Sequence, residues 1–87
     1  MDFTVREDDF EVLVERQKER VKNHILTSYI KLRKEKGITQ QEIADRTGIK
    51  RTNVARIESG KNAPTIEVFV KLAAALDMEL EIRLVER

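Results

Sequence analysis

The stretch from residue 40 to residue 59 constrains the fold more than any other part of the chain. It reads QQEIADRTGIKRTNVARIES, and its apolar residues recur at helical intervals on both sides of a glycine. Ala44 is small enough for another helix to cross above it, and Gly48 can take the positive φ of a tight turn. Val54 and Ile57 lie three residues apart and would fill the wedge between the helices. This spacing predicts two short helices that meet at a steep angle through a tight turn.

Start and stop signals flank this helix pair. Thr39 is expected to cap the first helix, with Glu42 at the third helical position completing a capping box. The second helix is expected over residues 51–59, ended by a glycine. After a polar loop, Thr65 caps a further helix. This last helix is predicted to have a broad apolar face made of Ile66, Phe69, Val70, Leu72, Ala73, Ala74 and Leu76.

The N-terminal part of the chain also has a helical pattern. Asp8 or Asp9 can cap a helix that starts just before Phe10, and Gly37 would end the run. The pattern allows one long helix as far as residue 36, or two helices that part near Asn23. Apolar or tolerated residues recur there mostly at steps of three and four, at Phe10, Leu13, Val14, Gln17, Val21, Ile25, Tyr29 and Leu32.

The period of the pattern changes near the C-terminus. After residue 78, Leu80, Ile82 and Leu84 alternate with charged residues, which predicts a β-strand with one apolar face. Within the chain, only residues 3–5 are a candidate neighbour, and a lone strand would leave its backbone groups unpaired. We therefore expect this strand to pair with its own copy in a two-fold dimer. A frayed amphipathic tail or a last helix remains the alternative.

Composition limits the class of protein. The chain has 87 residues, enough for one core, and we divide it into an extension (1–22), a central domain (23–76) and a dimerisation segment (77–87). The net charge is only +1, but residues 31–62 contain nine basic and four acidic residues, while both flanks are net negative. A basic centre between acidic ends is typical of a surface that faces a polyanion.

Other chemistry is disfavoured. The chain has no cysteine, no glycine-rich phosphate loop and no metal-ligand spacing, and its single histidine, His24, lies in a helical stretch. We therefore expect no enzyme, no cofactor and no metal. The first residues do not look like a signal peptide, and no apolar run approaches the length of a membrane span. A cytoplasmic protein, nucleoid-associated through DNA, is the expectation.

The central stretch resembles the lambda-repressor/Cro-like, or XRE-type, helix-turn-helix regulators. The resemblance covers roughly residues 29–80 and includes LRKEKGITQ at 32–40, IESGK at 57–61 and PTI at 64–66. It implies an all-α lambda-repressor-like bundle, here with an extra N-terminal helix and a C-terminal β-strand for dimerisation. The family's third helix, residues 51–59 here, would enter the major groove of double-stranded DNA.

The resemblance also assigns roles to single residues. The base-reading residues would be Lys50, Arg51, Thr52 and Arg56, because arginine suits guanine and the threonine methyl can touch thymine. The phosphate-binding residues would be Gln40, Asn53, Ser59, Lys61 and Asn62. Glu58 would repel DNA unless neutralised, and the family pairs an acid at this position with an arginine that corresponds to Arg33. We predict an Arg33–Glu58 ion pair that braces the recognition helix.

The function implied is a homodimeric transcriptional repressor that reads an inverted-repeat operator. A second function is implied by the arrangement of a charged N-terminal helix, the domain and the LEIRLV ending. Proteins of this kind are often antitoxins, which bind a small ribonuclease-type toxin and repress their own operon. Residues 8–22 would then bind the toxin. The structural alternative is a helix that pads the core or widens the dimer contact.

Overall fold

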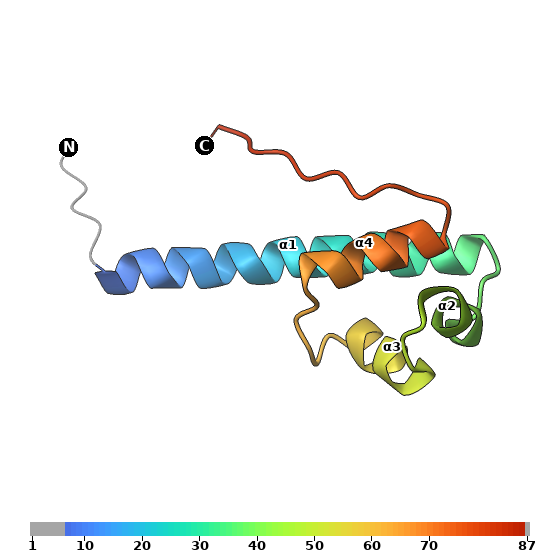
Figure 1. Cartoon of the computed structure of the whole chain (residues 1–87). Coiled ribbons are helices and arrows are strands. Elements are labelled where there is room, and N and C mark those ends of the chain that lie inside the picture. The colour runs from blue at the N-terminus through green and yellow to red at the C-terminus, as the bar shows by residue number, and fades with distance from the viewer. Residues whose placement is uncertain (1–6, 87) are drawn as a thin grey trace.

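The structure is a computed structural model that describes residues 7–86, and within this range it contains four α-helices and no strand. The helices are α1 (Glu7–Glu35), α2 (Gln40–Thr47), α3 (Arg51–Glu58) and α4 (Ile66–Ala75) (Figure 1). The shorter helices α2, α3 and α4 all gather against the C-terminal half of α1. In the described part of the chain, no helix is both long and apolar enough to pass through a membrane.

The helix α1 is continuous over 29 residues, so the choice between one helix and two is resolved in favour of one. The predicted extra N-terminal helix is therefore an extension of α1, and the boundary predicted between residues 22 and 23 lies inside it. The helix already begins at Glu7, so Asp8 and Asp9 are helical residues and not the expected cap. It ends as predicted at Gly37, whose φ of 68° allows the amide of Ile38 to donate to the carbonyl of Arg33.

The core lies where the four helices meet. The turn between α2 and α3 forms as predicted, with Gly48 at a φ of 78°. The predicted cap at the start of α2 also forms, with the side chain of Thr39 accepting from the amide of Glu42 at 3.1 Å. The buried apolar side chains are Leu26 and Tyr29 from α1, Ile43 and Ala44 from α2, Val54 and Ile57 from α3, Phe69, Leu72 and Ala75 from α4, and Leu76.

The broad apolar face predicted for α4 is buried only in part. Phe69 and Leu72 enter the core, but Ile66 and Val70 are 66% and 47% exposed. The reason is that α4 packs against α1 and α2 along one side, whereas Ile66 and Val70 lie farther round the helix. Two apolar positions of α4 therefore remain exposed to solvent in the described chain.

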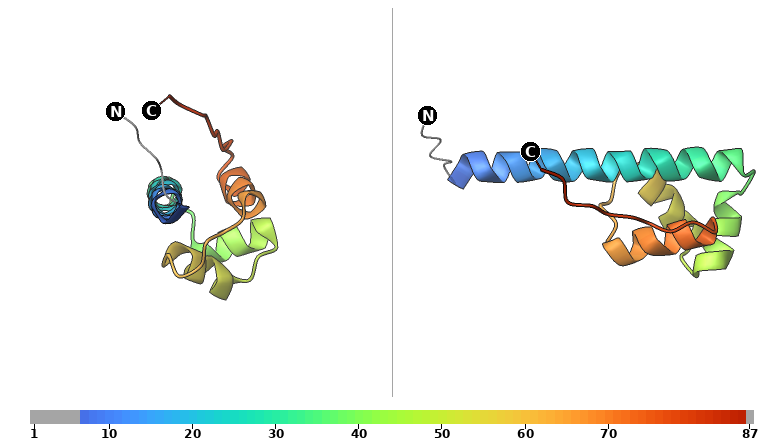
Figure 2. Two further views of the ribbon diagram at one scale, coloured as in Figure 1. Left: turned by 90° about the vertical axis from the view of Figure 1, so that its left-hand side faces the viewer. Right: turned by 90° about the horizontal axis from the view of Figure 1, so that it is seen from above.

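The predicted C-terminal β-strand is absent from residues 7–86. The chain leaves α4 through Asp77, which has a φ of 58°, and residues 78–86 then run back past α4, in the direction opposite to α1 (Figures 1 and 2). A strand requires the backbone groups of a neighbouring strand, and the described chain offers none to this segment. Residues 3–5, the one candidate within the chain, lie outside the described residues. Leu80 packs against the core, whereas Ile82 and Leu84 are exposed.

Candidate nucleic-acid interface

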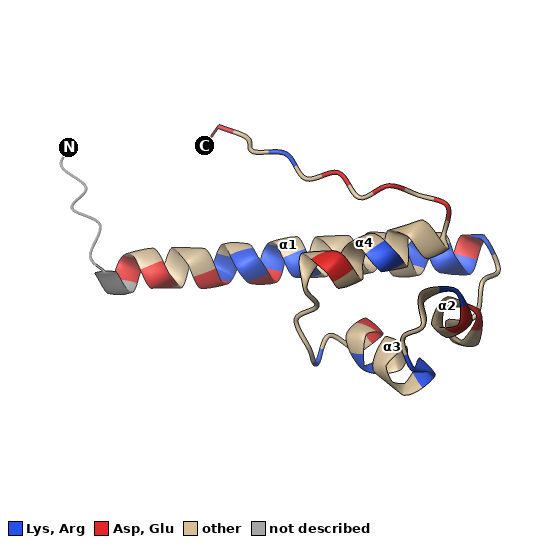
Figure 3. Cartoon of the chain, viewed as in Figure 1, with Lys and Arg blue, Asp and Glu red and all other residues tan. Residues whose placement is uncertain are grey.

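The helix α3 buries one side and exposes the other. Val54 and Ile57 are almost completely buried against α2, which follows from their spacing of three residues. The residues on the outward side of α3 and just after it are exposed, namely Arg51, Thr52, Asn53, Arg56 and Ser59. Lys50 precedes the helix at its N-cap and is also exposed. Positively charged side chains therefore stand at the start of α3 and along it (Figure 3).

The carboxylate of Glu58 is turned inward and held by side chains from two other helices. Arg33 binds it through two atoms, with Nη2 at 2.7 Å from Oε1 and Nε at 2.9 Å from Oε2. The hydroxyl of Tyr29 donates to Oε2 at 3.1 Å, and the amide of Gln40 donates to Oε1 at 3.2 Å. The ion pair predicted between Arg33 and Glu58 is present in the structure. It removes a negative charge from the outer surface of α3 and fixes this helix to α1.

The surroundings of Tyr29 keep its phenol protonated. Burial raises the pKa of Tyr29 well above its ordinary value, and the negative charge of Glu58 and the hydrogen bond to it raise this pKa further. The neighbouring charge of Arg33 acts in the opposite direction but does not outweigh these effects. The phenol therefore stays a hydrogen-bond donor to Glu58 at physiological pH.

The residues predicted to bind phosphate are arranged in different ways. Asn53 and Asn62 line one shallow hollow beside the start of α3, together with Lys50, which was predicted to read bases. Lys61 is exposed in the loop that follows α3. Gln40 is half-buried and uses its amide on Glu58, and the hydroxyl of Ser59 donates to the carbonyl of Arg56 at 2.7 Å. Any contact of Gln40 or Ser59 with DNA would have to share or replace these bonds.

Besides the bonds of Tyr29 and Gln40 to Glu58, two further long-range contacts were missed by the sequence reasoning. Lys22 has its ammonium 3.5 Å from the carbonyl of Gly60, which links α1 to the loop after α3. Lys22 lies one turn before Leu26 on the same side of α1, so helical spacing contained a signal for its inward position. Arg46 donates to the carbonyl of Ala75 at 2.7 Å and so binds the C-terminal end of α4. Nothing in the local sequence around Arg46 indicated this partner.

The geometry of α2, the turn at Gly48 and α3, together with the basic outer side of α3, defines a helix-turn-helix DNA-binding domain. A family model described as Helix-turn-helix matches residues 30–82, which is more than half of the chain. The protein therefore belongs to the helix-turn-helix family, and its DNA-binding domain is of the XRE type.

Similar curated proteins carry related names. The chain is 36% identical over 50 residues to an uncharacterized HTH-type transcriptional regulator of Sinorhizobium fredii, covering 58% of this chain and 65% of that protein. It is 38% identical over 47 residues to another from Methanothermobacter thermautotrophicus, covering 54% and 68%. It is 42% identical over 43 residues to the cryptic phage CTXphi transcriptional repressor RstR of Vibrio cholerae, covering 49% and 38%.

The matched region is thus limited in extent. The chain spans 65% of the length of the Sinorhizobium relative and only 38% of the phage repressor. No solved structure matches the chain. The similarity covers the domain built around α2 and α3 and supports its class, while the activity of the whole protein is inferred below.

Proposed function

We propose that this protein is a transcriptional repressor that binds a double-stranded DNA operator as a homodimer, with α3 of each copy in the major groove. Arg51, Thr52 and Arg56, with Lys50 beside them, would contact base edges. Asn53, Asn62 and Lys61 would contact phosphates around the start and end of α3. Ser59 and Gln40 would add phosphate contacts from the C-terminal end of α3 and the first turn of α2.

The observation that carries the proposal is the separation of charge on α3. The only acid of the helix, Glu58, points inward and is neutralised by Arg33 at 2.7 Å, while Arg51 and Arg56 remain exposed. A helix inserted between two rows of phosphates must avoid an uncompensated carboxylate, and this arrangement does so. Lys61 and Lys50 add positive charge on the loops at either end of α3.

Base reading and phosphate binding can be separated by two substitutions. Arg51→Ala should weaken binding to the cognate operator by about 1–3 kcal/mol and relax base preference at one position, because a bidentate contact to guanine is lost. Lys61→Ala should weaken binding to cognate and random DNA equally and make the affinity less dependent on salt. Gel-shift titrations of both variants on cognate and random DNA, at several salt concentrations, measure these affinities. An equal loss on both DNAs for Arg51→Ala would remove it from the base readers.

Dimerisation is the second part of the proposal. Ile82 and Leu84 are 58% and 103% exposed, although their alternation with charged residues is typical of a strand with one apolar face. Pairing of this segment with its own copy would bury both side chains and satisfy the backbone groups of both strands. The two copies of α3 would then read half-sites of an inverted repeat about 34–36 Å apart, or a multiple of this distance.

Substitutions on the two sides of this segment test the dimer. Ile82→Asp and Leu84→Asp should yield monomers in light scattering and erode operator binding, because a charge would be buried in the interface. Arg83→Asp is the matched control, since Arg83 alternates with them and would point away from the interface. Variants that remain dimeric would locate the interface elsewhere, with the N-terminal half of α1 as the next candidate.

A second candidate function is the antitoxin of a type II toxin–antitoxin pair. It is favoured by the N-terminal half of α1, where every side chain from Asp9 to Val21 is exposed and several are large and apolar. Residues 8–22 would bind a small ribonuclease-type toxin in this case. The test is to co-express the full chain with the small protein encoded beside it, and to measure both complex formation and rescue of growth. A neighbour that is harmless and does not bind would reject this candidate.

A further inference from the structure

The exposed half of α1 has a continuous apolar stripe on one side. Phe10, Val14 and Val21 are 60%, 47% and 41% exposed. Their spacing of four and seven residues puts them on one side of the helix, with Gln17 between them. Monomeric proteins rarely leave several large apolar side chains exposed side by side on one surface. The stripe is therefore expected to have a partner.

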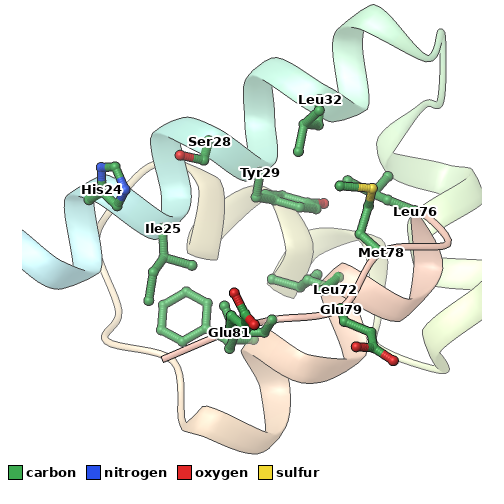
Figure 4. A pocket seen from close by; sticks show the side chains of 13 residues that line it. His24, Ile25, Ser28, Tyr29, Leu32, Leu72, Leu76, Met78, Glu79 and Glu81 are labelled. Carbon is green, nitrogen blue, oxygen red and sulfur yellow. The ribbon is translucent and has the colours of Figure 1, made fainter. Parts of the chain in front are cut away.

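The stripe continues into a groove at the other half of α1. One wall is formed by α1, through His24, Ile25, Ser28 and Leu32, which continue the stripe at steps of three and four residues (Figure 4). The opposite wall comes from α4, through Phe69, Leu72 and Ala73. The C-terminal segment completes the lining with residues that include Met78 and Leu80. The lining is mainly apolar, so the groove fits an apolar helix edge better than a polar ligand.

We propose that the N-terminal half of α1 from a second copy of this chain occupies the groove, and that the exchange is reciprocal. The two α1 helices would then be antiparallel, with Val21 of each copy beside Val21 of the other at the two-fold axis. This register brings Phe10 opposite Leu32 and Val14 opposite Ser28, because each pair lies at equal distances on either side of residue 21. Phe10 would enter the groove where Leu32 and Leu76 line it.

The charges of α1 favour a second copy as the occupant and fix its direction. Residues 7–19 carry six acidic and two basic side chains, whereas residues 20–36 carry six basic and one acidic. Antiparallel pairing places the negative half of each helix along the positive half of the other. Parallel pairing would place like charges side by side and would be repulsive. The helix is thus complementary to itself in both apolar pattern and charge.

This inference rests on the proposed homodimer and specifies a second contact within it. The C-terminal segment lies over the same groove, so Leu80, Ile82 and Leu84 would contact the incoming helix from above. Ile66 and Val70 are exposed on α4, the helix that supplies Phe69 and Ala73 to the groove, and would be covered as well. One interface would then bury most of the large apolar side chains that the described chain exposes, with Val12 left outside it.

The first experiment is cross-linking of the full chain through a single introduced cysteine, since the protein has none of its own. Val21→Cys should cross-link rapidly to its copy with a short bis-maleimide, because the two side chains meet at the axis. Asn23→Cys is the matched control: it is exposed, two residues away, and faces the opposite side of α1. The two control thiols would be about 20 Å apart, across two helix diameters, and should cross-link at the rate of random collision.

The second experiment compares two valines of equal exposure. Val12 and Val14 are both 47% exposed but lie on opposite sides of α1. Val14→Asp should raise the dimer dissociation constant about tenfold or more in sedimentation equilibrium, while Val12→Asp should leave it within about twofold. Both side chains are exposed in the single chain, so neither substitution disturbs its core.

Equal cross-linking of the two cysteine variants, or equal effects of the two aspartates, would overturn the inference. If the wild-type chain is then still a dimer that binds its operator, the proposed function stands and the C-terminal segment alone holds the copies together. The stripe would in that case be free for a different protein, such as a toxin. A wild-type chain that is monomeric and does not bind DNA would reject the proposed function itself.

Discussion

The two halves of α1 have similar helical patterns but very different surroundings. Between Leu26 and Arg33, the helix buries Leu26, Tyr29 and Arg33 against α2, α3 and α4. Between Asp9 and Val21, every side chain is exposed. A solitary helix of this length is marginal in water. The comparison teaches that the periodic pattern specifies a helix, whereas the contacts that stabilise it come from the rest of the fold in one half and are not supplied by the described chain in the other.

The largest loss of stability is expected when the ion pair in the packed half of α1 is removed. Arg33→Ala leaves the carboxylate of Glu58 buried with only Tyr29 and Gln40 as donors, and removing one partner of a buried pair costs about 3–5 kcal/mol. At about 4–8 °C per kcal/mol for a domain of this size, the melting temperature should fall steeply. Lys34→Ala is the control, because Lys34 is exposed on the same helix turn. An unchanged melting temperature for Arg33→Ala would mean that the pair contributes nothing to stability.

The next prediction compares the same substitution, leucine to alanine, in the two halves of α1. Leu26 is 4% exposed and Leu13 is 39% exposed. Leu26→Ala should lower the free energy of unfolding by about 2–4 kcal/mol, since it opens a cavity in the core. Leu13→Ala should cost less than about 1 kcal/mol when measured in urea on a monomeric Ile82→Asp background. Similar costs for the two would mean that the N-terminal half is packed within the monomer after all.

A smaller effect concerns Tyr29 and pH. Tyr29→Phe removes one hydrogen bond to Glu58 and should cost about 1 kcal/mol at neutral pH. Folding raises the pKa of Tyr29 above its ordinary value of 10.0, so the unfolded chain loses this proton first as the pH rises. The stability linked to this proton is complete below pH 10 and decreases above it.

Tyr29 is the only tyrosine, so ultraviolet absorbance reports its ionisation alone. The folded protein should keep the phenol protonated beyond pH 10, and unfolding curves of Tyr29→Phe should lack the corresponding part of the alkaline loss. Ionisation of the folded chain near pH 10 would contradict the hydrogen bond to Glu58.

The smallest effect is expected for an ion pair in the exposed half. Lys18 lies 3.0 Å from Glu15, but the two side chains are 54% and 62% exposed. Lys18→Ala should therefore change the free energy of unfolding by less than about 0.5 kcal/mol, because solvent screens such pairs. Its N···O distance is close to that of the Arg33–Glu58 pair, so chemical denaturation of both alanine variants measures the effect of burial on an ion pair. A loss above 1 kcal/mol for Lys18→Ala would mean that Lys18 has a further partner.

Much of the central fold follows from local signals in the sequence. Ala44 and Gly48 define the turn between α2 and α3, and the capping box of Thr39 and Glu42 defines the start of α2, because each signal acts within a few residues. Arg33 and Glu58 were paired in advance only through the family resemblance. The base-reading and phosphate-binding assignments are still predictions.

The wrong predictions, the open alternative for α1 and the missed contacts all concern features that depend on residues far away in the sequence. Periodicity could not tell whether α1 is interrupted at Asn23, or which side of α4 is buried. A strand at Leu80 to Leu84 depends on backbone groups that the described chain does not supply. The contacts of Lys22 and Arg46 join residues 38 and 29 positions apart, and local patterns contain little information about such pairs.

The bonds of Glu58 to Arg33 and Tyr29 have a consequence for the operator. They fix α3 to α1, so in the proposed dimer the contact between the two copies of α1 would also set the distance between their recognition helices. Sliding the two α1 helices past each other by seven residues would move these recognition helices by about 10 Å, close to three base pairs of DNA. The register along α1 would thereby select which spacings between half-sites the protein accepts, without any change in the residues that touch the bases.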